Sequence, residues 1–184
     1  MTTLSKQDWI EAAMQSLVEE GVSKLSIVKL AKRLKVTRGS FYYHFNSLND
    51  LIDAMVKAWE SDVIDKGFAM ARASADTANQ EVRLLIEFVT RLTDRKDLVF
   101  RQWAAQNERV RQHMERLDTK RLAIMTELFQ RLAGSREKGE AYANIAFYGY
   151  IGCLNSYPRP SAKRQKALSL EILELLCSDL NKNR

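Results

Sequence analysis

Apolar residues recur along this chain at the spacing that places them on one face of an α-helix. In residues 6–20 they follow the i, i+3, i+4, i+7, i+8 pattern of an amphipathic helix. The same spacing predicts short helices over about 27–34 and 38–44, and a longer helix from Ser47 to about residue 70. No stretch alternates apolar and polar residues as a half-buried strand would. The pattern therefore predicts an all-α protein of about nine helices.

A short stretch of small and polar residues, 71–79, separates two helical blocks. Behind it, apolar stripes predict helices around 82–92, 98–104 and 110–132, the last with a break near 112–115. Residues 134–139 are predicted to form a loop. Helices follow over about 140–156 and 162–180, with the only two prolines of the chain between them. We therefore predict an N-terminal domain over residues 1–50, a connecting helix over 51–70 and a larger helical domain over 71–184.

The net charge of +6 over 184 residues is unevenly distributed. Residues 21–49 hold six basic side chains and no acidic one, so the rest of the chain is neutral overall. A basic segment of this kind is typical of a surface that binds a polyanion. The alternative is a basic face that is simply solvated.

Cysteine and histidine are too rare to suggest a bound metal. Cys153 and Cys177 are too few for a disulfide framework or a zinc site, and both histidines lie far from them in the sequence. We predict no metal, no cofactor and a reducing, cytoplasmic compartment. The polar start indicates no signal peptide. The longest nearly apolar stretch, Ile145–Leu154, has ten residues and is too short to span a bilayer, so no membrane partner is expected.

Residues 26–49 have the form of a helix-turn-helix, with a short helix, a tight break and a second short helix. Its second helix leaves polar side chains at the N-terminus, where free N–H groups and the helix dipole favour phosphate. Gly39 lets the backbone approach DNA closely, because it has no side chain. A glycine in a helix costs about 1 kcal/mol relative to alanine, so we interpret Gly39 as part of a site. The apolar positions that would pack the two helices are Ile27, Leu30, Leu34, Val36, Phe41 and Phe45.

The segment from Leu25 to Leu51 resembles the DNA-binding region of the TetR family of bacterial transcriptional regulators. The resemblance rests on Leu30-Ala31, Val36-Thr37, the run Gly39-Ser-Phe-Tyr-Tyr-His-Phe45 and Asn49-Asp-Leu51. In that family the second helix of the motif reads the major groove, and a larger helical domain binds a small molecule and dimerises. The resemblance therefore implies a homodimer that binds a pseudo-palindromic operator in double-stranded DNA and responds to a small-molecule effector.

The resemblance also implies which side chains touch DNA. Arg38, Gly39 and Ser40 would contact base edges, with Arg38 the candidate for bidentate recognition of a guanine. Lys29 and Lys24 would add positive charge beside the DNA backbone. The implied phosphate contacts come from Ser26, Thr37, Tyr42, Tyr43 and His44. For the two tyrosines and the histidine, packing within the scaffold is the alternative.

Two positions depart from the pattern of the family. Lys35 stands where the family commonly has a glycine, because the turn needs a left-handed backbone. Keeping that conformation with a lysine costs about 1–2 kcal/mol. Leu48 stands where the family often has a lysine that touches phosphate, so one phosphate contact is expected to be missing.

In the larger domain the resemblance implies a cavity, which we expect to measure roughly 300 Å³ or more and to take an apolar or aromatic effector. Its predicted lining consists of Phe88, Phe100, Trp103, Met125 and Tyr148. Core packing is the alternative for these side chains. The predicted dimer interface consists of Ala146, Gly149, Gly152, Cys153, Leu168, Ile172 and Leu175. Packing inside the subunit is the alternative there. The basic residues of this domain, Arg121 among them, are interpreted as a solvated face.

Three functions compete at this point. The first is a dimeric transcriptional regulator, most often a repressor in this family, that a small effector releases from its operator. The second is a ligand-independent, architectural DNA-binding protein of the same fold. The third is a helical enzyme or adaptor whose basic segment meets protein or lipid. No phosphate-cradling glycine loop, metal-ligand spacing or nucleophile motif appears, so we predict that the chain is not an enzyme.

Overall fold

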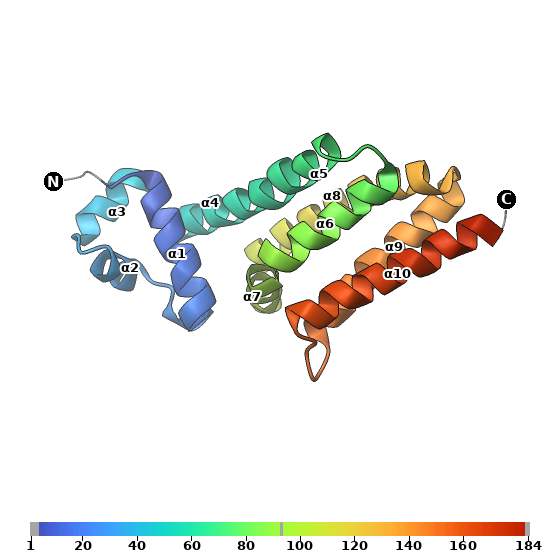
Figure 1. Ribbon diagram of the computed structural model, residues 1–184. Helices are drawn as coiled ribbons and strands as arrows, with labels where there is room; N and C mark the ends of the chain where they lie inside the picture. Colours follow the sequence, from blue (N-terminus) through green and yellow to red (C-terminus); the bar gives the residue numbers. More distant parts are fainter. Residues whose placement is uncertain (1–3, 93, 183–184) are drawn as a thin grey trace. The chain divides into compact units, whose positions relative to one another are not determined.

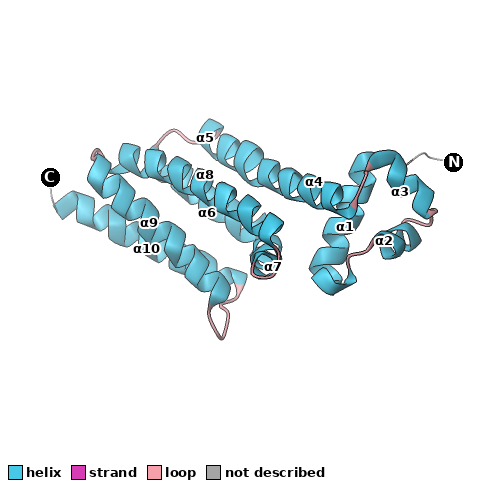
Figure 2. Cartoon of the chain, turned by 180° about the vertical axis from the view of Figure 1, so that it is seen from behind, coloured by secondary structure: helices cyan, strands magenta, loops and turns pink. Residues whose placement is uncertain are grey.

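The computed structural model describes residues 4–92 and 94–182, which form helices and loops and no strand (Figures 1 and 2). The α-helices are α1 Lys6–Glu20, α2 Ile27–Arg33, α3 Arg38–His44, α4 Leu48–Ser61, α5 Ala69–Ala73, α6 Ala78–Leu92, α7 Asp94–Ala104, α8 Glu108–Ala133, α9 Arg136–Asn155 and α10 Ala162–Lys182. A 3₁₀ turn, Val22–Lys24, follows α1, and a π-helical stretch, Asp62–Phe68, joins α4 to α5. The predicted all-α fold is confirmed. None of the helices in the described part of the chain is long and apolar enough to cross a membrane.

Hydrogen bonds from side chains fix the starts of several helices where the sequence indicates them. The Ser5 side chain accepts from the Asp8 N–H, and the Asp8 carboxylate accepts from the Ser5 N–H, which forms a complete capping box. The Ser47 side chain accepts from the Asp50 N–H and so caps α4. The side-chain hydrogen bonds from Ser5 and Ser47 hold the pKa of the Asp8 and Asp50 carboxyl groups below its usual range. The local sequence thus sets where α1 and α4 begin.

The chain divides into two compact units, which we call unit 1 and unit 2. Unit 1 comprises Met1–Asp62 and Arg95–Met114, and unit 2 comprises Val63–Asp94 and Glu115–Arg184. The sequence places all of residues 71–184 in one domain, whereas the structure places Arg95–Met114 in unit 1. Aromatic packing explains this placement, because the Phe100 ring stacks on the Trp59 ring of α4 with 4.7 Å between centroids.

Unit 1 has an aromatic centre formed by three of its helices. Phe41 of α3 is buried and packs edge-on against Trp9 of α1, with 5.2 Å between ring centroids. Phe45 stacks on Phe41 at 5.5 Å. Leu51 and Met55 of α4 are fully buried in the same unit. These apolar side chains hold α3 in place from one side only, which leaves its other side to solvent.

Unit 2 is a bundle built from α6, the second part of α8, α9 and α10. α10 packs against both α6 and α9, and the three run side by side in both views (Figures 1 and 2). Its core consists of Ala71, Val82, Leu85, Leu128, Phe129, Tyr142, Ala143, Leu173 and Leu176. A buried carboxylate, Glu81, is paired with Arg131 at 2.7 Å. The bundle therefore supplies the apolar interior in which a cavity can form.

Two local predictions for this region are wrong. The expected break near 112–115 is absent, and α8 runs without interruption from Glu108 to Ala133. The expected loop over 134–139 is shorter, because Ser135 caps α9 through the Lys138 N–H and the helix starts at Arg136. Gly134 alone has a positive φ, 65°, in this loop. The connection between α8 and α9 is thus a tight one.

Candidate functional site

The side chains of α3 point in two directions, which gives this helix a buried face and a free face. Phe41 and Phe45 lie in the core of unit 1, whereas Tyr42 and Tyr43 are 52% and 83% exposed. Neighbouring exposed apolar side chains that form a patch can mark a contact surface. The free face of α3 is therefore a candidate contact surface.

The turn between α2 and α3 has the left-handed residue that the sequence predicts. Lys35 has φ 56°, and it is the only non-glycine residue with positive φ in the described ranges. The Lys35 N–H donates to the Lys32 carbonyl, and the Val36 N–H donates to the Ala31 carbonyl. This tight turn sets the angle between α2 and α3 and so positions the free face of α3.

Two of the proposed phosphate contacts lie at helix starts and differ in how they are engaged. Ser26 is half-buried, and its hydroxyl accepts from the Lys29 N–H at 3.4 Å, which caps α2. Thr37 is exposed at the start of α3, and its side chain makes no capping hydrogen bond. The first N–H groups of α3 therefore have no side-chain cap from Thr37, which suits an anion at that end.

The nine residues predicted to contact DNA all lie in α2, in α3 or at their N-caps. Ser26, Ser40 and His44 are half-buried, and the exposed ones are Lys29, Thr37, Arg38, Gly39, Tyr42 and Tyr43. The His44 ring lies edge-on to the Tyr43 ring with 5.1 Å between centroids. Leu48, where a phosphate-binding lysine is common, is the first residue of α4 and is half-buried. Contact of these residues with DNA stays a prediction.

The basic charge of residues 21–49 is largely uncompensated. Arg33 is the exception, since its guanidinium pairs with Glu19 at 2.6 Å and Glu20 at 3.2 Å. The hydrogen bond from Arg33 to Glu19 raises the pKa of this guanidinium. The basic residues that form no ion pair with another described residue are Lys24, Lys29, Lys32, Lys35 and Arg38. This segment is thus a surface of positive charge interleaved with exposed aromatic rings.

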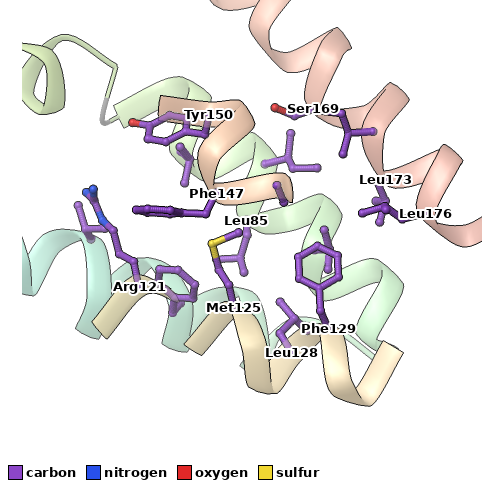
Figure 3. A pocket seen from close by; sticks show the side chains of 17 residues that line it. Leu85, Arg121, Met125, Leu128, Phe129, Phe147, Tyr150, Ser169, Leu173 and Leu176 are labelled. Atoms are coloured by element: carbon purple, nitrogen blue, oxygen red, sulfur yellow. The ribbon is translucent and has the colours of Figure 1, made fainter. Parts of the chain in front are cut away.

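Unit 2 contains a cavity of about 110 Å³, which is smaller than the roughly 300 Å³ expected for a typical ligand pocket. Residues of α6, α8, α9 and α10 line it, together with Val63 and Phe68 of the π-helical stretch (Figure 3). Of the five side chains predicted to line a cavity, Met125 does so. Phe88, Phe100, Trp103 and Tyr148 are not among its lining residues.

Each of those four side chains has another environment. Phe100 and Trp103 are buried in unit 1, where Phe100 stacks on Trp59. Phe88 lies so close to Gly67 that a Cβ at position 67 would overlap its ring. Tyr148 is 61% exposed. The periodicity of apolar residues shows which side of a helix is covered, but not by which unit, and this ambiguity explains the difference.

Sequence reasoning missed three polar residues that do line the cavity, namely Arg121, Tyr150 and Ser169. The sequence predicts that Arg121 belongs to a solvated face, but the structure buries it, with 5% of its surface exposed. Arg121 precedes Met125 and Leu128 by four and seven residues, so the three share one face of α8. This spacing is the signal in the sequence that places Arg121 on the same side of α8 as two apolar residues of the cavity wall.

Both α9 and α10 carry exposed large apolar side chains, which we call together the exposed apolar face of α9 and α10. Ile145 and Tyr148 are exposed large apolar side chains of α9, and Leu175 of α10 is 71% exposed. Gly149 and Gly152 share the face of Ile145 and Tyr148 by their spacing. Other residues predicted for a dimer interface face inward, because Ala146 and Ile172 line the cavity. Leu168 and the free thiol Cys153 are half-buried.

These features define a helical protein of the helix-turn-helix class, with a basic, aromatic α3 and a separate helical bundle. The model of the family described as "Bacterial regulatory proteins, tetR family" matches residues 10–55, which include the whole motif. The helix-turn-helix region of the chain therefore matches this family, and the resemblance predicted from the sequence is confirmed.

Curated proteins are similar to this chain either over most of its length or over the helix-turn-helix region alone. The chain is 25% identical over 171 residues to the nucleoid occlusion factor SlmA of Vibrio atlanticus, with 87% of each chain covered. It is 41% identical over 58 residues to the class G tetracycline repressor protein of Vibrio anguillarum, which is 32% of this chain and 28% of that protein.

Among solved structures, a TetR-family transcriptional regulator from Streptomyces coelicolor is similar with a TM-score of 0.80 and 17% identity, covering 95% of both chains. A TetR transcription regulator from Haloarcula marismortui has a TM-score of 0.76 and 13% identity, covering 92% of this chain and 96% of that one. At these identities the similarity shows the fold alone.

Proposed function

We propose that this protein is a dimeric transcriptional regulator that binds a pseudo-palindromic operator in double-stranded DNA through α3. The match of residues 10–55 to the TetR family and the free, basic face of α3 support the proposal. The observation that carries it is the split of α3, in which Phe41 is buried while Tyr42 and Tyr43 are exposed beside five uncompensated cations. We place the protein in the cytoplasm, at the nucleoid.

Direct base recognition is assigned to the start of α3. Arg38, Gly39 and Ser40 occupy the first turn of this helix, and the N-terminal residues of a recognition helix are those that reach base edges. Arg38 is exposed, and its guanidinium can bind guanine O6 and N7 together. Tyr42, Tyr43 and the lysines would then contact phosphates and fix the register, without sequence information of their own.

We further propose that the protein acts as a repressor and that a small effector, bound in the cavity of unit 2, releases it from DNA. Binding of DNA and of effector would then oppose each other, because each favours a different state of the protein. Such coupling is typically worth about 1–3 kcal/mol. The apolar cavity of about 110 Å³ supports a small effector.

Selection of bound sequences from a random DNA pool tests the proposal most directly. We expect a pseudo-palindrome whose affinity falls with salt at a log–log slope of about −5 or steeper, for roughly six neutralised phosphates per dimer. Arg38→Ala should cost about 1–3 kcal/mol and relax one base pair in each half-site. Arg38→Lys is the matched control, since it keeps the charge but loses the bidentate geometry. A flat salt response would exclude the proposal.

The homodimer is assigned to the exposed apolar face of α9 and α10. In an isologous interface the same face of both subunits would be covered. Leu175→Asp should give monomers by light scattering, because Leu175 is exposed on this face. Ile172→Asp is less informative, since Ile172 lines the cavity and its loss would disturb the bundle itself. A Leu175→Asp protein that stays dimeric would place the interface elsewhere.

The second candidate is a ligand-independent, architectural DNA-binding protein. Two observations favour it: the full-length similarity is to a protein named nucleoid occlusion factor, and the cavity is small. Thermal unfolding with a panel of apolar and aromatic compounds separates the two candidates. Stabilisation and release from DNA by one compound supports the regulator. Strong DNA binding with no response to any compound supports the architectural function.

A further inference from the structure

We infer that two lysines, Lys6 and Lys35, contact the phosphate backbone of DNA at the two ends of α3, so that a cation brackets the proposed recognition helix on each side. The inference rests on the proposed function, in which α3 enters the major groove, and it names binding residues that the motif resemblance does not assign. A strained backbone carries it at Lys35, and an ammonium held over an aromatic ring carries it at Lys6.

Lys35 occupies the position at the end of α2 where a glycine fits best. The Lys35 N–H donates to the Lys32 carbonyl and the Val36 N–H donates to the Ala31 carbonyl, which is the hydrogen-bond pattern of a Schellman motif. The residue that follows the C-cap in this motif has a left-handed backbone and is usually glycine. Lys35 has φ 56° there, so the chain keeps a strained lysine where glycine would remove the strain. Strain retained at an exposed position points to a function.

The place of this turn in the motif indicates what Lys35 meets. In a helix-turn-helix the first helix crosses the DNA backbone and the N-terminal residues of the second enter the major groove. The turn that joins α2 to α3 therefore passes over the edge of the groove, where the phosphates lie. Lys35 is exposed and forms no ion pair with another described residue, so its ammonium is available to a phosphate. The alternative is that Lys35 only offsets the dipole at the end of α2.

The other end of α3 takes its cation from α1. No lysine or arginine lies between Arg38 and Lys57, so neither the rest of α3 nor the start of α4 supplies one. The Lys6 ammonium lies 5.0 Å from the centre of the Phe45 ring, and Phe45 is the C-cap of α3. A cation over an aromatic face is attracted to the ring. This contact holds the Lys6 side chain beside the end of α3.

The acidic residue nearest to Lys6 in the sequence does not pair with it. The Asp8 carboxylate accepts from the Ser5 N–H at 2.6 Å and from the Ser5 hydroxyl at 2.7 Å. Lys6 forms no ion pair within the part of the chain that the structure describes. Since α3 has seven residues, it is about 10 Å long, which is close to the roughly 12 Å width of the major groove. Cations at its two ends can therefore reach the phosphates of both strands.

Binding of the full chain to the selected duplex, measured over a range of salt concentrations, tests the inference. Lys35→Gly and Lys6→Met each remove one charge per subunit, and Lys6→Met keeps an apolar side chain on Phe45. Each variant should make the log–log salt slope shallower by about 2 per dimer, which in about 0.15 M salt means roughly 30-fold weaker binding to every sequence. Lys35→Arg and Lys6→Arg keep the charge and should bind like the wild type. Lys57→Ala, at an exposed lysine of α4, is the matched control and should keep the wild-type slope.

The stability of Lys35→Gly separates a DNA contact from a structural role. If Lys35 serves DNA binding, the glycine variant unfolds at a higher urea concentration than the wild type and binds DNA more weakly. If Lys35 serves only the dipole of α2, the variant is less stable and keeps the wild-type salt slope, which overturns the inference. A loss confined to one base pair of the operator would show a base contact and would overturn it as well.

Neutral methylphosphonate linkages, placed one at a time in the duplex, identify the phosphate that each lysine meets. The linkage at that phosphate should weaken the wild type about fivefold in about 0.15 M salt, and it should have no further effect on the variant that lacks the lysine. We expect two different phosphates for Lys35 and Lys6, on opposite strands of one half-site. One shared phosphate, or no phosphate that couples to either lysine, overturns the inference.

The same measurements separate the inference from the function on which it rests. If the wild type binds the selected duplex and both Lys35→Gly and Lys6→Met keep its salt slope, the inference alone fails and the DNA-binding function stands. If the wild type binds no duplex, the proposed function fails and the inference fails with it.

Discussion

Replacing Lys35 by glycine should stabilise the protein. Lys35 has φ 56° in the turn between α2 and α3, where the Cβ of an L-residue crowds the following carbonyl oxygen. This conformation costs about 1–2 kcal/mol for a non-glycine residue. Glycine removes that cost but gains about 0.5–1 kcal/mol of conformational entropy in the unfolded chain. The net gain in the free energy of unfolding should be about 0.5–1 kcal/mol, which corresponds to roughly 1–4 °C in Tm for a chain of this size.

The assay is urea unfolding followed by circular dichroism, with two controls that isolate the backbone effect. Lys35→Ala removes the same charge but keeps the strained φ, so it should be less stable than Lys35→Gly. At Lys57, which is exposed inside α4, the order should reverse, and Lys57→Gly should be about 1 kcal/mol less stable than Lys57→Ala. If alanine at position 35 proves as stable as glycine, the left-handed turn is not the source of strain and the reasoning is wrong.

Three further predictions concern packing, titration and a charge cluster. Gly139→Ala should lower the free energy of unfolding in urea by about 1–3 kcal/mol, because the Cβ of the alanine would overlap the Gln130 backbone. In the control Gly152→Ala the Cβ meets no atom, so this variant should not lose stability. Burial and the hydrogen bond to Asp179 raise the pKa of Tyr142 from 10.0 to about 12, so stability should be constant below pH 10 and fall as the pH rises from 10 to 12. Tyr142→Phe should flatten that fall in alkaline unfolding curves, and an unaltered curve would contradict the assignment. The Asp53 carboxylate accepts a hydrogen bond from Arg109 at 2.7 Å and lies 3.0 Å from the His113 ring nitrogen. Asp53→Asn should therefore lower the Tm by an amount that corresponds to about 1–2 kcal/mol. An unchanged Tm in this variant would show that these contacts do not stabilise the fold.

The helix-turn-helix could be predicted in detail because its determinants are local. Ser5 with Asp8, Ser26, and Ser47 with Asp50 each fix a helix start within four residues of sequence. The left-handed turn at Lys35 follows from the motif. The contact between the Phe41 and Phe45 rings follows from their spacing, because the two residues are one helical turn apart.

The lining of the cavity could not be predicted with the same success, because it depends on contacts between distant segments. An apolar stripe on a helix indicates a covered face but not its partner, so Trp103 and Met125 have the same pattern and different environments. Tyr148 belongs to a stripe that lies on the exposed side of α9. The burial of Arg121 depends on α9 and α10, which the sequence of α8 does not reveal.

The division into two units has a consequence for spectroscopy. The protein has three tryptophans, Trp9, Trp59 and Trp103, and all lie in unit 1, where they are buried. Fluorescence excited selectively at tryptophan therefore observes unit 1 alone, while unit 2 contributes tyrosine emission. A ligand seated among the residues of unit 2 has no indole of its own unit to quench. Any change that it causes in the indole spectrum is a signal passed from one unit to the other, and the native chain needs no added label to show it.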